Sequence, residues 1–593
     1  MPTSGRTWKF SLPQVRYVET PRGYHFEFGR FSLTQSTFLL LAAIFVGLGG
    51  GFGAVLFRWL IESETSIAFG RLAPALGFLG HANVVPVLII GGVLTSFIVD
   101  RFAKEAKGHG VPEVMASVAL RGGIMRPRII AVKSIASATC IGFGGSCGRE
   151  GPIVQIGATI GSLIGQTARA PAPIVRTLVA CGAAAGISAT FNAPIGGVFF
   201  AAEVILGEFT PRSFASIVVA SVVSAVIGRS VFGDHPSFTA AAFYLASPAE
   251  LVLYALFGII AAFWATGFVK LLYALEDRFD AWKAHVWLKA MLGFGLVGGI
   301  GMVYPQVLGV GYGNIDAVLS QHVPALHALI LAFLKPLATS LTLSAGGSGG
   351  IFAPSLYAGA MLGDAFGNVV HYAFPSWTAS AAAYGLVGMA ALFAAAAEAP
   401  ITSIMIVFEM SNDYTIILPL MVSTVVATLL GRHLLGQTIY EMKLIRQGID
   451  WVRARRPSLF NRIHVSSVRR DPPVVAQTGE SLREVAMRLH HTDEFVVPVL
   501  HDDLFVGIVT SSEIACSLAR DPEGEGRIED LLQQQVSTLA PNDTLEQAAI
   551  SMANPEVPLL PVVDPFSGVF LGIVTRRDIL NAYRSATEGS GDR

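Results

Sequence analysis

The chain has 593 residues, of which 52% are hydrophobic and 14% are charged, and its mean hydropathy is +0.57. A soluble chain usually carries about a quarter charged residues, so this composition excludes an ordinary soluble protein. The formal net charge of −1 indicates nothing about partners.

The first 35 residues are polar and contain five basic side chains but no apolar core, so we do not expect a cleavable signal peptide. Basic residues also follow the last apolar run, at Lys443, at Arg446 and at three arginines between 453 and 456. Because basic flanks stay on the cytoplasmic side, we expect a cytoplasmic N-terminal segment at 1–35, a cytoplasmic C-terminus and an even number of crossings.

Long apolar runs fill the chain from about residue 36 to residue 433. Three examples are the stretches 36–57, 250–269 and 416–430. Spans of about 20 apolar residues are long enough to cross a bilayer as helices. The sequence therefore predicts a polytopic α-helical membrane protein.

The membrane region contains an internal repeat. Residues 148–165 align with 350–367 at a shift of 202 positions and share four glycines, one proline and one alanine. A second pair, 192–203 and 398–409, places a glutamate nine positions after the proline of an Ala-Pro dipeptide. Two homologous halves with glycine-proline breaks are typical of transporters with broken helices. The pattern alone does not decide whether the halves are inverted.

The stretches GGSCGREGP (144–152) and AGGSGGIFAP (345–354) each place a glycine-rich turn before a helix. The first N–H groups of such a helix are unpaired and its dipole adds positive charge, so both breaks predict an anion site. Glu150 lies at this point, where its carboxylate would compete with an anion until it is protonated. One alternative is close helix packing, which fits the spaced glycines of 157–165 better. Another is a structural ion pair with Arg149, although adjacent helical residues point in different directions.

Four motifs make residues 36–446 resemble the CLC family of chloride channels and proton-coupled chloride exchangers. They are GHGVPEV (108–114), GREGP (148–152), GGIFAP (349–354) and Tyr440 in QTIYEM. The resemblance implies a CLC-type membrane domain over 36–446, built from two inverted repeats of broken, tilted helices. It also implies a homodimer in a lipid bilayer, with one pore per subunit and with chloride or a similar small anion as the permeant ion.

The resemblance also assigns residues to the site. The central anion would meet the N–H groups of Ile351 and Phe352 and the hydroxyl of Tyr440, and Glu150 would be the gating glutamate. The N–H groups at Arg149–Gly151 would form a more external site. The predicted anion-binding residues are therefore His109, Gly148, Arg149, Gly151, Ile351, Phe352 and Tyr440. No cofactor is required, and no metal or catalytic residue is predicted.

Two positions depart from the usual family pattern. His109 replaces a serine or proline, so an imidazole either faces the central site or turns away from it. The exchangers usually carry two adjacent glutamates, the second of which relays protons. Here the pair is Glu203 and Val204, so valine stands at the proton-relay position. Because valine carries no proton, we favour a passive, glutamate-gated anion channel. A proton-coupled exchanger is the alternative, since water chains can also carry protons. Glu203 itself is expected to be a paired structural carboxylate.

A serine protease and a cation transporter are the two alternatives to anion transport. Residues 144–148 match the GxSxG serine elbow around Ser146, and GGSG around Ser348 is similar to the motif of intramembrane serine proteases. No base has a recognisable catalytic context near either serine, so the protease is a remote alternative. A cation transporter would need more acidic residues in its spans. The four cysteines show no CxxC pairing, and we predict a protein that is not an enzyme.

The composition becomes that of a soluble domain near residue 450. We expect a linker at 447–462, a tandem α/β pair at 463–525 and 526–585, and a disordered tail at 586–593. The two members of the pair share V-x-P-V and G-I-V-T elements. This region resembles the CBS domain pair that many CLC proteins carry.

Some CBS domains hold the ribose of an adenine nucleotide with a threonine and an aspartate. Thr575 and Asp578 fit that pattern, and Thr510 with Glu513 is a weaker match. Binding of an adenine nucleotide and a purely structural role stand as equal alternatives. We expect no nucleic-acid partner, and we expect an integral protein of the bacterial inner membrane with both termini in the cytoplasm.

Overall fold

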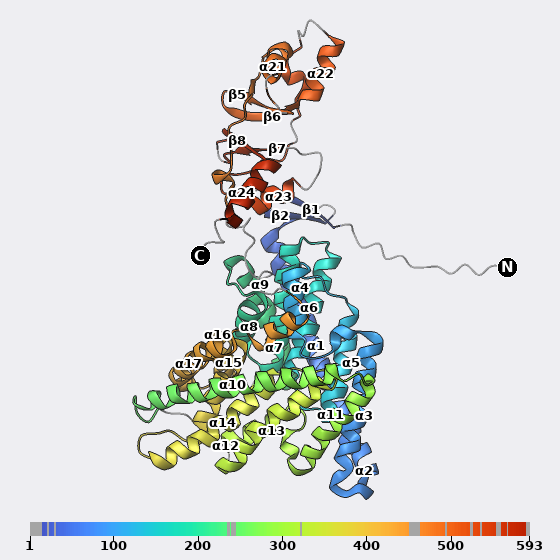
Figure 1. Cartoon of the computed structure of the whole chain (residues 1–593), viewed down its shortest axis with the longest axis vertical. Coiled ribbons are helices and arrows are strands. Elements are labelled where there is room, and N and C mark those ends of the chain that lie inside the picture. The colour runs from blue at the N-terminus through green and yellow to red at the C-terminus, as the bar shows by residue number, and fades with distance from the viewer. Residues whose placement is uncertain are drawn as a thin grey trace, which may run out of the picture. The chain divides into compact units, whose positions relative to one another are not determined.

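The computed structural model describes residues 15–20, 23–28, 31–233, 238, 245–320, 323–449, 463–490, 492, 495–521, 526–533, 536–552, 559–565 and 567–588. The chain divides into two compact units, Met1–Trp451 and Val452–Arg593, and both are drawn in Figure 1. Most of the predicted linker at 447–462 lies outside the described residues.

The first unit begins with a small antiparallel sheet that the sequence analysis did not predict. Its strands are β1 (Val15–Thr20), β2 (Gly23–Phe28) and β3 (Phe31–Thr34), in that order. The first membrane helix starts directly after β3, and the Thr34 hydroxyl accepts from the Thr37 N–H at this N-terminus. Phe26 of the sheet stacks on Phe38 of the helix with ring centroids 4.0 Å apart, so the sheet is packed onto the helical domain.

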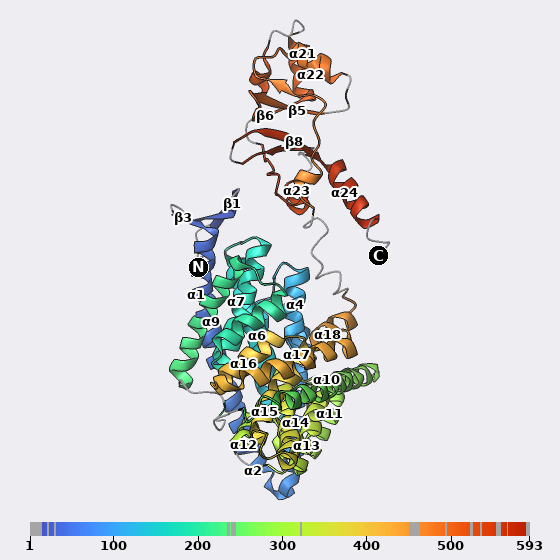
Figure 2. The same ribbon diagram turned by 90° about the vertical axis from the view of Figure 1, so that its left-hand side faces the viewer.

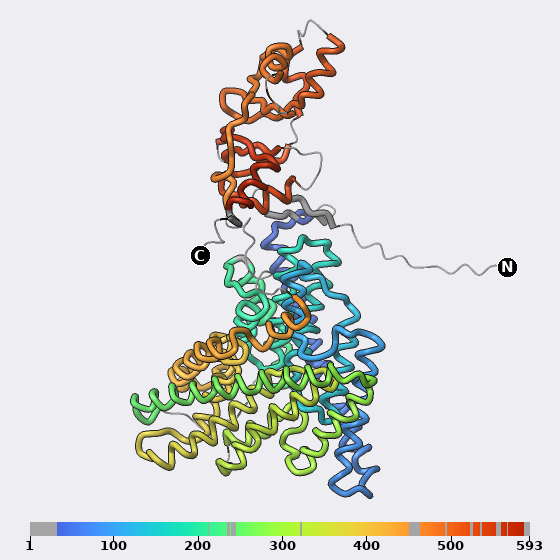
Figure 3. The backbone as a smooth tube through the Cα atoms, viewed as in Figure 1, coloured from blue at the N-terminus to red at the C-terminus, as the bar shows by residue number. Residues whose placement is uncertain are grey.

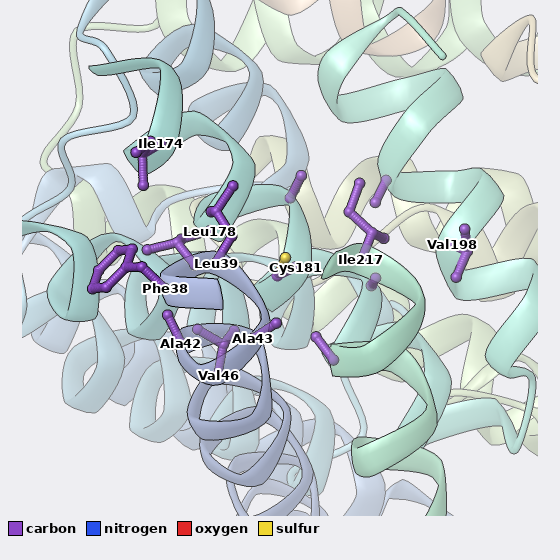
Figure 4. Close-up of a cluster of buried hydrophobic side chains, with 14 of the residues drawn as sticks. Phe38, Leu39, Ala42, Ala43, Val46, Ile174, Leu178, Cys181, Val198 and Ile217 are labelled. Atoms are coloured by element: carbon purple, nitrogen blue, oxygen red, sulfur yellow. The ribbon is translucent and has the colours of Figure 1, made fainter. Parts of the chain in front are cut away.

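Helices α1 to α9 form the first half of the membrane domain. Their bounds are α1 (Gln35–Thr65), α2 (Ala73–Ala75), α3 (Val84–Phe102), α4 (Val111–Leu120), α5 (Arg128–Gly142), α6 (Glu150–Thr167), α7 (Ala172–Phe191), α8 (Pro194–Phe200) and α9 (Pro211–Phe232). Helices α1, α7 and α9 lie side by side in both ribbon views (Figures 1 and 2). Their apolar faces enclose a buried cluster, and Figure 4 shows Phe38 and Val46 of α1 beside Leu178 of α7 and Ile217 of α9.

Helices α10 to α18 form the second half. Their bounds are α10 (Glu250–Ala281), α11 (Val286–Val303), α12 (Tyr312–Ser320), α13 (Ala325–Ser344), α14 (Phe352–Ala373), α15 (Ala381–Ala397), α16 (Pro400–Ser411), α17 (Ile417–Leu435) and α18 (Ile439–Arg446). The tube in Figure 3 follows the 32-residue helix α10 across this half. Within the described ranges, eight helical stretches are long and apolar enough to cross a membrane.

The spaced glycines of the two halves allow the same close helix packing. A Cβ added at Gly157 would lie 2.1 Å from the carbonyl oxygen of Gly182, and one at Gly359 would lie 2.1 Å from that of Gly388. Helices α6 and α7 therefore touch backbone to backbone, and so do α14 and α15. This agrees with the packing role that the sequence analysis favoured for the glycines of 157–165.

Each half also caps a helix of the other half. The Glu203 carboxylate accepts from the N–H groups of Ile401 and Thr402, at 3.3 and 2.8 Å, in the first turn of α16. The Glu409 carboxylate accepts from the N–H groups of Ile195 and Gly196, at 2.9 and 2.6 Å, in the first turn of α8. The two repeats are thus interlocked through reciprocal helix caps.

The second unit contains two α/β modules. The first has β4 (Ala476–Gln477), α21 (Leu482–Leu489), β5 (Val496–His501), β6 (Leu504–Thr510) and α22 (Ser511–Arg520). The second has α23 (Leu545–Ser551), β7 (Leu559–Val563), β8 (Phe570–Thr575) and α24 (Arg576–Glu588). In the second module, the position equivalent to β4 is a single bridge between Leu539 and Val562.

The two modules pack against each other through their hairpins. The Phe505 N–H donates to Gly568, the Phe570 N–H donates to Asp503, and the two phenylalanine rings stack with centroids 6.1 Å apart. The predicted disordered tail at 586–593 was placed too early, because α24 continues to Glu588. Residues 589–593 lie outside the described residues.

Candidate anion site

Three loops meet at the centre of the membrane domain. The loop before α6 pairs with the loop before α14, because Gly148 and Gly350 exchange two N–H···O bonds of 2.7 and 2.6 Å. The loop before α4 joins them, since the Gly108 N–H donates to Gly347 at 3.1 Å and the Gly349 N–H donates to Gly108 at 3.3 Å. The breaks that the sequence placed in separate halves are therefore adjacent.

This pairing leaves no room for side chains at several glycines. A Cβ at Gly151 would lie 2.0 Å from the carbonyl oxygen of His109, and one at Gly350 would lie 2.7 Å from the Gly151 nitrogen. Gly110, with φ of 85°, has a backbone conformation that other residues rarely adopt. The glycines thus bring the starts of α4, α6 and α14 within backbone contact of one another.

Helix N-termini supply the positive end of this centre. The first N–H groups of α4, α6 and α14 have no acceptor within their own helices, and each dipole adds partial positive charge. Helix α18 starts beside them. The Tyr273 hydroxyl donates to the carbonyl of Ile439, the first residue of α18, and the Tyr273 ring lies 6.4 Å from the His109 ring. Tyr440, in the first turn of α18, is 1% exposed. Buried N–H groups around one point form a site that suits an anion.

Glu150, the first residue of α6, fills part of this site. Its side chain is buried, and its Oε2 accepts from the N–H of Ala353 in the first turn of α14 at 3.3 Å. Its Oε1 accepts from the hydroxyl of Tyr312, the first residue of α12. The carboxylate thus accepts from a backbone N–H at the start of α14, as predicted for the anion. This donor, Ala353, is one residue beyond the predicted donors Ile351 and Phe352.

Arg149 does not pair with Glu150 in the part of the chain that the structure describes. Its Nη2 donates to the carbonyl of Thr190 at 3.3 Å, and its guanidinium lies 5.0 Å from the centre of the Tyr312 ring. The structural ion pair considered from the sequence is therefore absent from the described contacts. Arg149 instead lines a pocket of about 270 Å³ together with Phe191, Phe238 and Tyr312.

His109 lies in the loop before α4 and is 4% exposed. Its Nδ1 has no hydrogen-bond partner among the residues that the structure describes. The imidazole is therefore available to an anion, to water or to a proton, and the structure leaves both alternatives for this side chain open.

Two buried lysines were missed by the sequence analysis. Their positions differ by 335 − 133 = 202, which is the shift of the repeat. Each Nζ donates to two backbone carbonyls of a loop before a short helix, at 2.7 to 2.9 Å. The acceptors are Ala106 and Gly108 for Lys133, and Val307 and Gly309 for Lys335. The signal in the sequence that could have identified them is a lysine within an apolar stretch at equivalent positions of the two repeats.

The carboxylate of Glu203 is fully engaged as the cap of α16. Besides the two backbone donors, the Thr402 hydroxyl donates to its Oε2 at 2.6 Å. Val204 follows it in a buried position with 7% exposure. These contacts agree with the structural role expected for Glu203.

The two serines of the protease alternative have structural partners. Ser146 Oγ lies 3.2 Å from the Thr339 hydroxyl, and Ser348 Oγ donates to the Ala106 carbonyl at 2.7 Å. Neither serine contacts a histidine among the described hydrogen bonds, so a nucleophile with its base is not assembled here.

The candidate nucleotide residues cap helices in the second unit. The Asp578 carboxylate accepts from the Thr575 hydroxyl at 2.6 Å and lies 3.3 Å from the Nε of Arg470. Glu513 accepts from the Thr510 hydroxyl at 2.7 Å in the same way. Although partial burial acts to raise the pKa of Glu513, the hydrogen bonds from Thr510 hold it below its ordinary value. Each threonine is thus paired with the acidic residue that the motif predicts.

A membrane domain with paired repeats, adjacent helix N-termini and a buried carboxylate among them defines an anion-transport protein. The family model described as voltage gated chloride channel matches residues 91–432, and the CBS domain model matches 465–520 and 528–585. The chain therefore belongs to the CLC family of anion transporters and carries a CBS domain pair, and it is not an enzyme. The predicted fold class is confirmed.

Curated relatives match the membrane domain over most of their own length. The H(+)/Cl(−) exchange transporter ClcA of Yersinia pestis is 32% identical over 448 residues, which cover 72% of this chain and 92% of that protein. The ClcB-like chloride channel protein of Ralstonia nicotianae is 31% identical over 427 residues, which cover 70% of this chain and 98% of that protein.

Solved structures share the fold. A slow cyanobacterial Cl−/H+ antiporter superposes with a TM-score of 0.64 at 25% identity, covering 70% of this chain and 98% of its own. A eukaryotic CLC transporter reaches a TM-score of 0.61 at 18% identity and covers 91% of this chain and 97% of its own, which supports the fold alone.

Proposed function

We propose that this protein exchanges chloride for protons across the membrane. The observation that carries the proposal is the position of Glu150, whose buried carboxylate accepts an N–H at the start of α14. A chloride ion would need the same kind of donor, so the carboxylate and the anion exclude each other. Protonation of Glu150 removes the charge that competes with the anion. Each time the Glu150 side chain leaves the site, it therefore carries a proton.

The exchanger replaces the channel as the preferred mechanism. The sequence alone favours a channel, because Val204 cannot carry a proton. Several relatives at about 32% identity are named H(+)/Cl(−) exchange transporters, and this supports the exchanger. The Glu203 carboxylate accepts three hydrogen bonds at the start of α16, so the inward proton path in this proposal uses neither Glu203 nor Val204. Water in the interior can carry the proton instead.

The test is simultaneous recording of chloride and pH in liposomes that contain the purified full chain. With a chloride gradient and no protonophore, an exchanger moves protons uphill at a fixed ratio to chloride. Glu150→Gln, which keeps the shape of the side chain without its charge, should move chloride alone and independently of pH. If wild-type protein dissipates the chloride gradient under a valinomycin and potassium clamp without moving protons, the channel is correct and the exchanger is wrong.

The finer assignments belong to the same proposal. We place the protein in the bacterial inner membrane with both termini in the cytoplasm, as a homodimer with one anion path per subunit. The basic flanks and the bacterial relatives support this placement. His109, Gly148, Arg149 and Gly151 would line the path with Tyr440 and the start of α14. Crosslinking in membranes and protease accessibility from each side test the dimer and the orientation.

A further inference from the structure

Tyr312 is held in one orientation at the edge of the anion site. Its ring lies edge-on to Phe191 and Phe238, with centroids 6.2 and 5.9 Å away, and the Arg149 guanidinium lies 5.0 Å from its centre. Two aromatic edges and a cation over one ring leave little rotational freedom. The hydroxyl is therefore aimed at a fixed point.

That point is the carboxylate of Glu150. The Tyr312 hydroxyl donates to Oε1, while the Ala353 N–H donates to Oε2. The carboxylate is thus held from two sides, by α12 and by α14. Tyr312 also lines the pocket of about 270 Å³, whereas Glu150 is not among the described residues that line it. The tyrosine therefore stands between this pocket and the gating carboxylate.

We propose that Tyr312 is a positioning residue that latches the ionised carboxylate of Glu150 in the anion site. This inference rests on the proposed function, because it assumes that Glu150 is the gate. A phenol that donates to a carboxylate stabilises the charged form more than the neutral acid. An anion that arrives from the pocket must replace this contact, so the strength of the latch sets how much acid is needed to release the gate.

Other charged or titratable groups also face Glu150. Arg149 precedes it on the same element, Lys335 lies within electrostatic range on α13, and Tyr440 does so on α18. A change confined to the Tyr312 hydroxyl leaves all three in place. Tyr312→Phe is therefore the clean perturbation, since the ring keeps its contacts with Phe191 and Phe238.

The experiment measures anion flux against pH in liposomes for Tyr312→Phe. Loss of one charge-assisted hydrogen bond should raise the midpoint of acid activation by about one pH unit, so that flux near neutral pH increases roughly tenfold. Tyr357→Phe is the matched control, because that buried tyrosine has no hydroxyl partner among the described residues. Its midpoint should equal that of the wild-type protein.

The double variant Glu150→Gln with Tyr312→Phe separates the latch from the gate. Its flux should match that of Glu150→Gln alone at every pH, since the latch acts only through the carboxylate. If Glu150→Gln is independent of pH but Tyr312→Phe keeps the wild-type midpoint, the latch is wrong and the gating role of Glu150 in the proposed function stands. If Glu150→Gln keeps its full acid dependence, both the gate and the latch are overturned.

Discussion

Replacing Glu203 by glutamine tests whether this side chain is a helix cap or part of a proton path. In the structure, one carboxylate oxygen accepts the Thr402 N–H and hydroxyl at 2.8 and 2.6 Å, and the other accepts the Ile401 N–H at 3.3 Å. Glutamine keeps one acceptor oxygen but turns an NH₂ group toward the remaining donor. One charge-assisted bond and the charge at the helix N-terminus are lost, which should cost about 2 kcal/mol of stability.

The reciprocal cap supplies the matched control. Glu409 accepts the N–H groups of Ile195 and Gly196, one at each oxygen, so Glu409→Gln also loses one bond and one charge. Both variants should lower the apparent midpoint of thermal unfolding in detergent by similar amounts. Both should also keep the wild-type ratio of protons to chloride in liposomes.

One result would refute this reasoning. If Glu203→Gln abolished proton movement at wild-type stability while Glu409→Gln did not, Glu203 would be a proton carrier. The cap seen in the structure would then be incidental to its function.

Three further outcomes are expected. Gly151→Ala should lower flux at least about tenfold, because its Cβ would lie 2.0 Å from the His109 carbonyl, whereas Gly267→Ala, with no atom within 4 Å, should keep full flux. His109→Ser should change anion selectivity or the pH response if the imidazole faces the path, and unchanged values for both would show that it turns away. Calorimetry on the full chain with ATP, ADP and AMP should show weak binding that Asp578→Asn reduces, and an absence of heat with all three would leave the CBS pair with a structural role only.

The sequence was most informative where backbone geometry forces a residue type. The contiguous glycines before α6 and α14 predicted the breaks, and the structure pairs them through Gly148 and Gly350. The repeat also contained information that was not used, since Lys133 and Lys335 are related by the same shift of 202. A buried lysine in an apolar helix needs hydrogen-bond acceptors. An equivalent lysine in the other half therefore indicates a structural role shared by the two repeats.

Other features could not be read from one sequence. Tyr312 lies in no motif, and at a shift of 202 its counterpart is Gly110, so the repeat hides its role. Its importance depends on a contact with Glu150 across 162 positions of chain. Which N–H at the start of α14 donates to the Glu150 carboxylate also depends on the side-chain rotamer of Glu150, which the sequence does not show. The N-terminal sheet was missed because the polar character of residues 1–35 was interpreted only as a cytoplasmic flank.

The reciprocal caps have a consequence for the order of biosynthesis. When α8 is first made, the acceptor for its Gly196 N–H lies on Glu409, 213 residues downstream. At a synthesis rate of 5–20 residues per second, roughly 10 to 40 s pass before that glutamate exists. Bare N–H groups are costly in lipid, so the nascent first half must keep this helix end near water, the insertion machinery or a temporary acceptor. The cap of α8 is therefore completed only after α16, which carries Glu409, has been made.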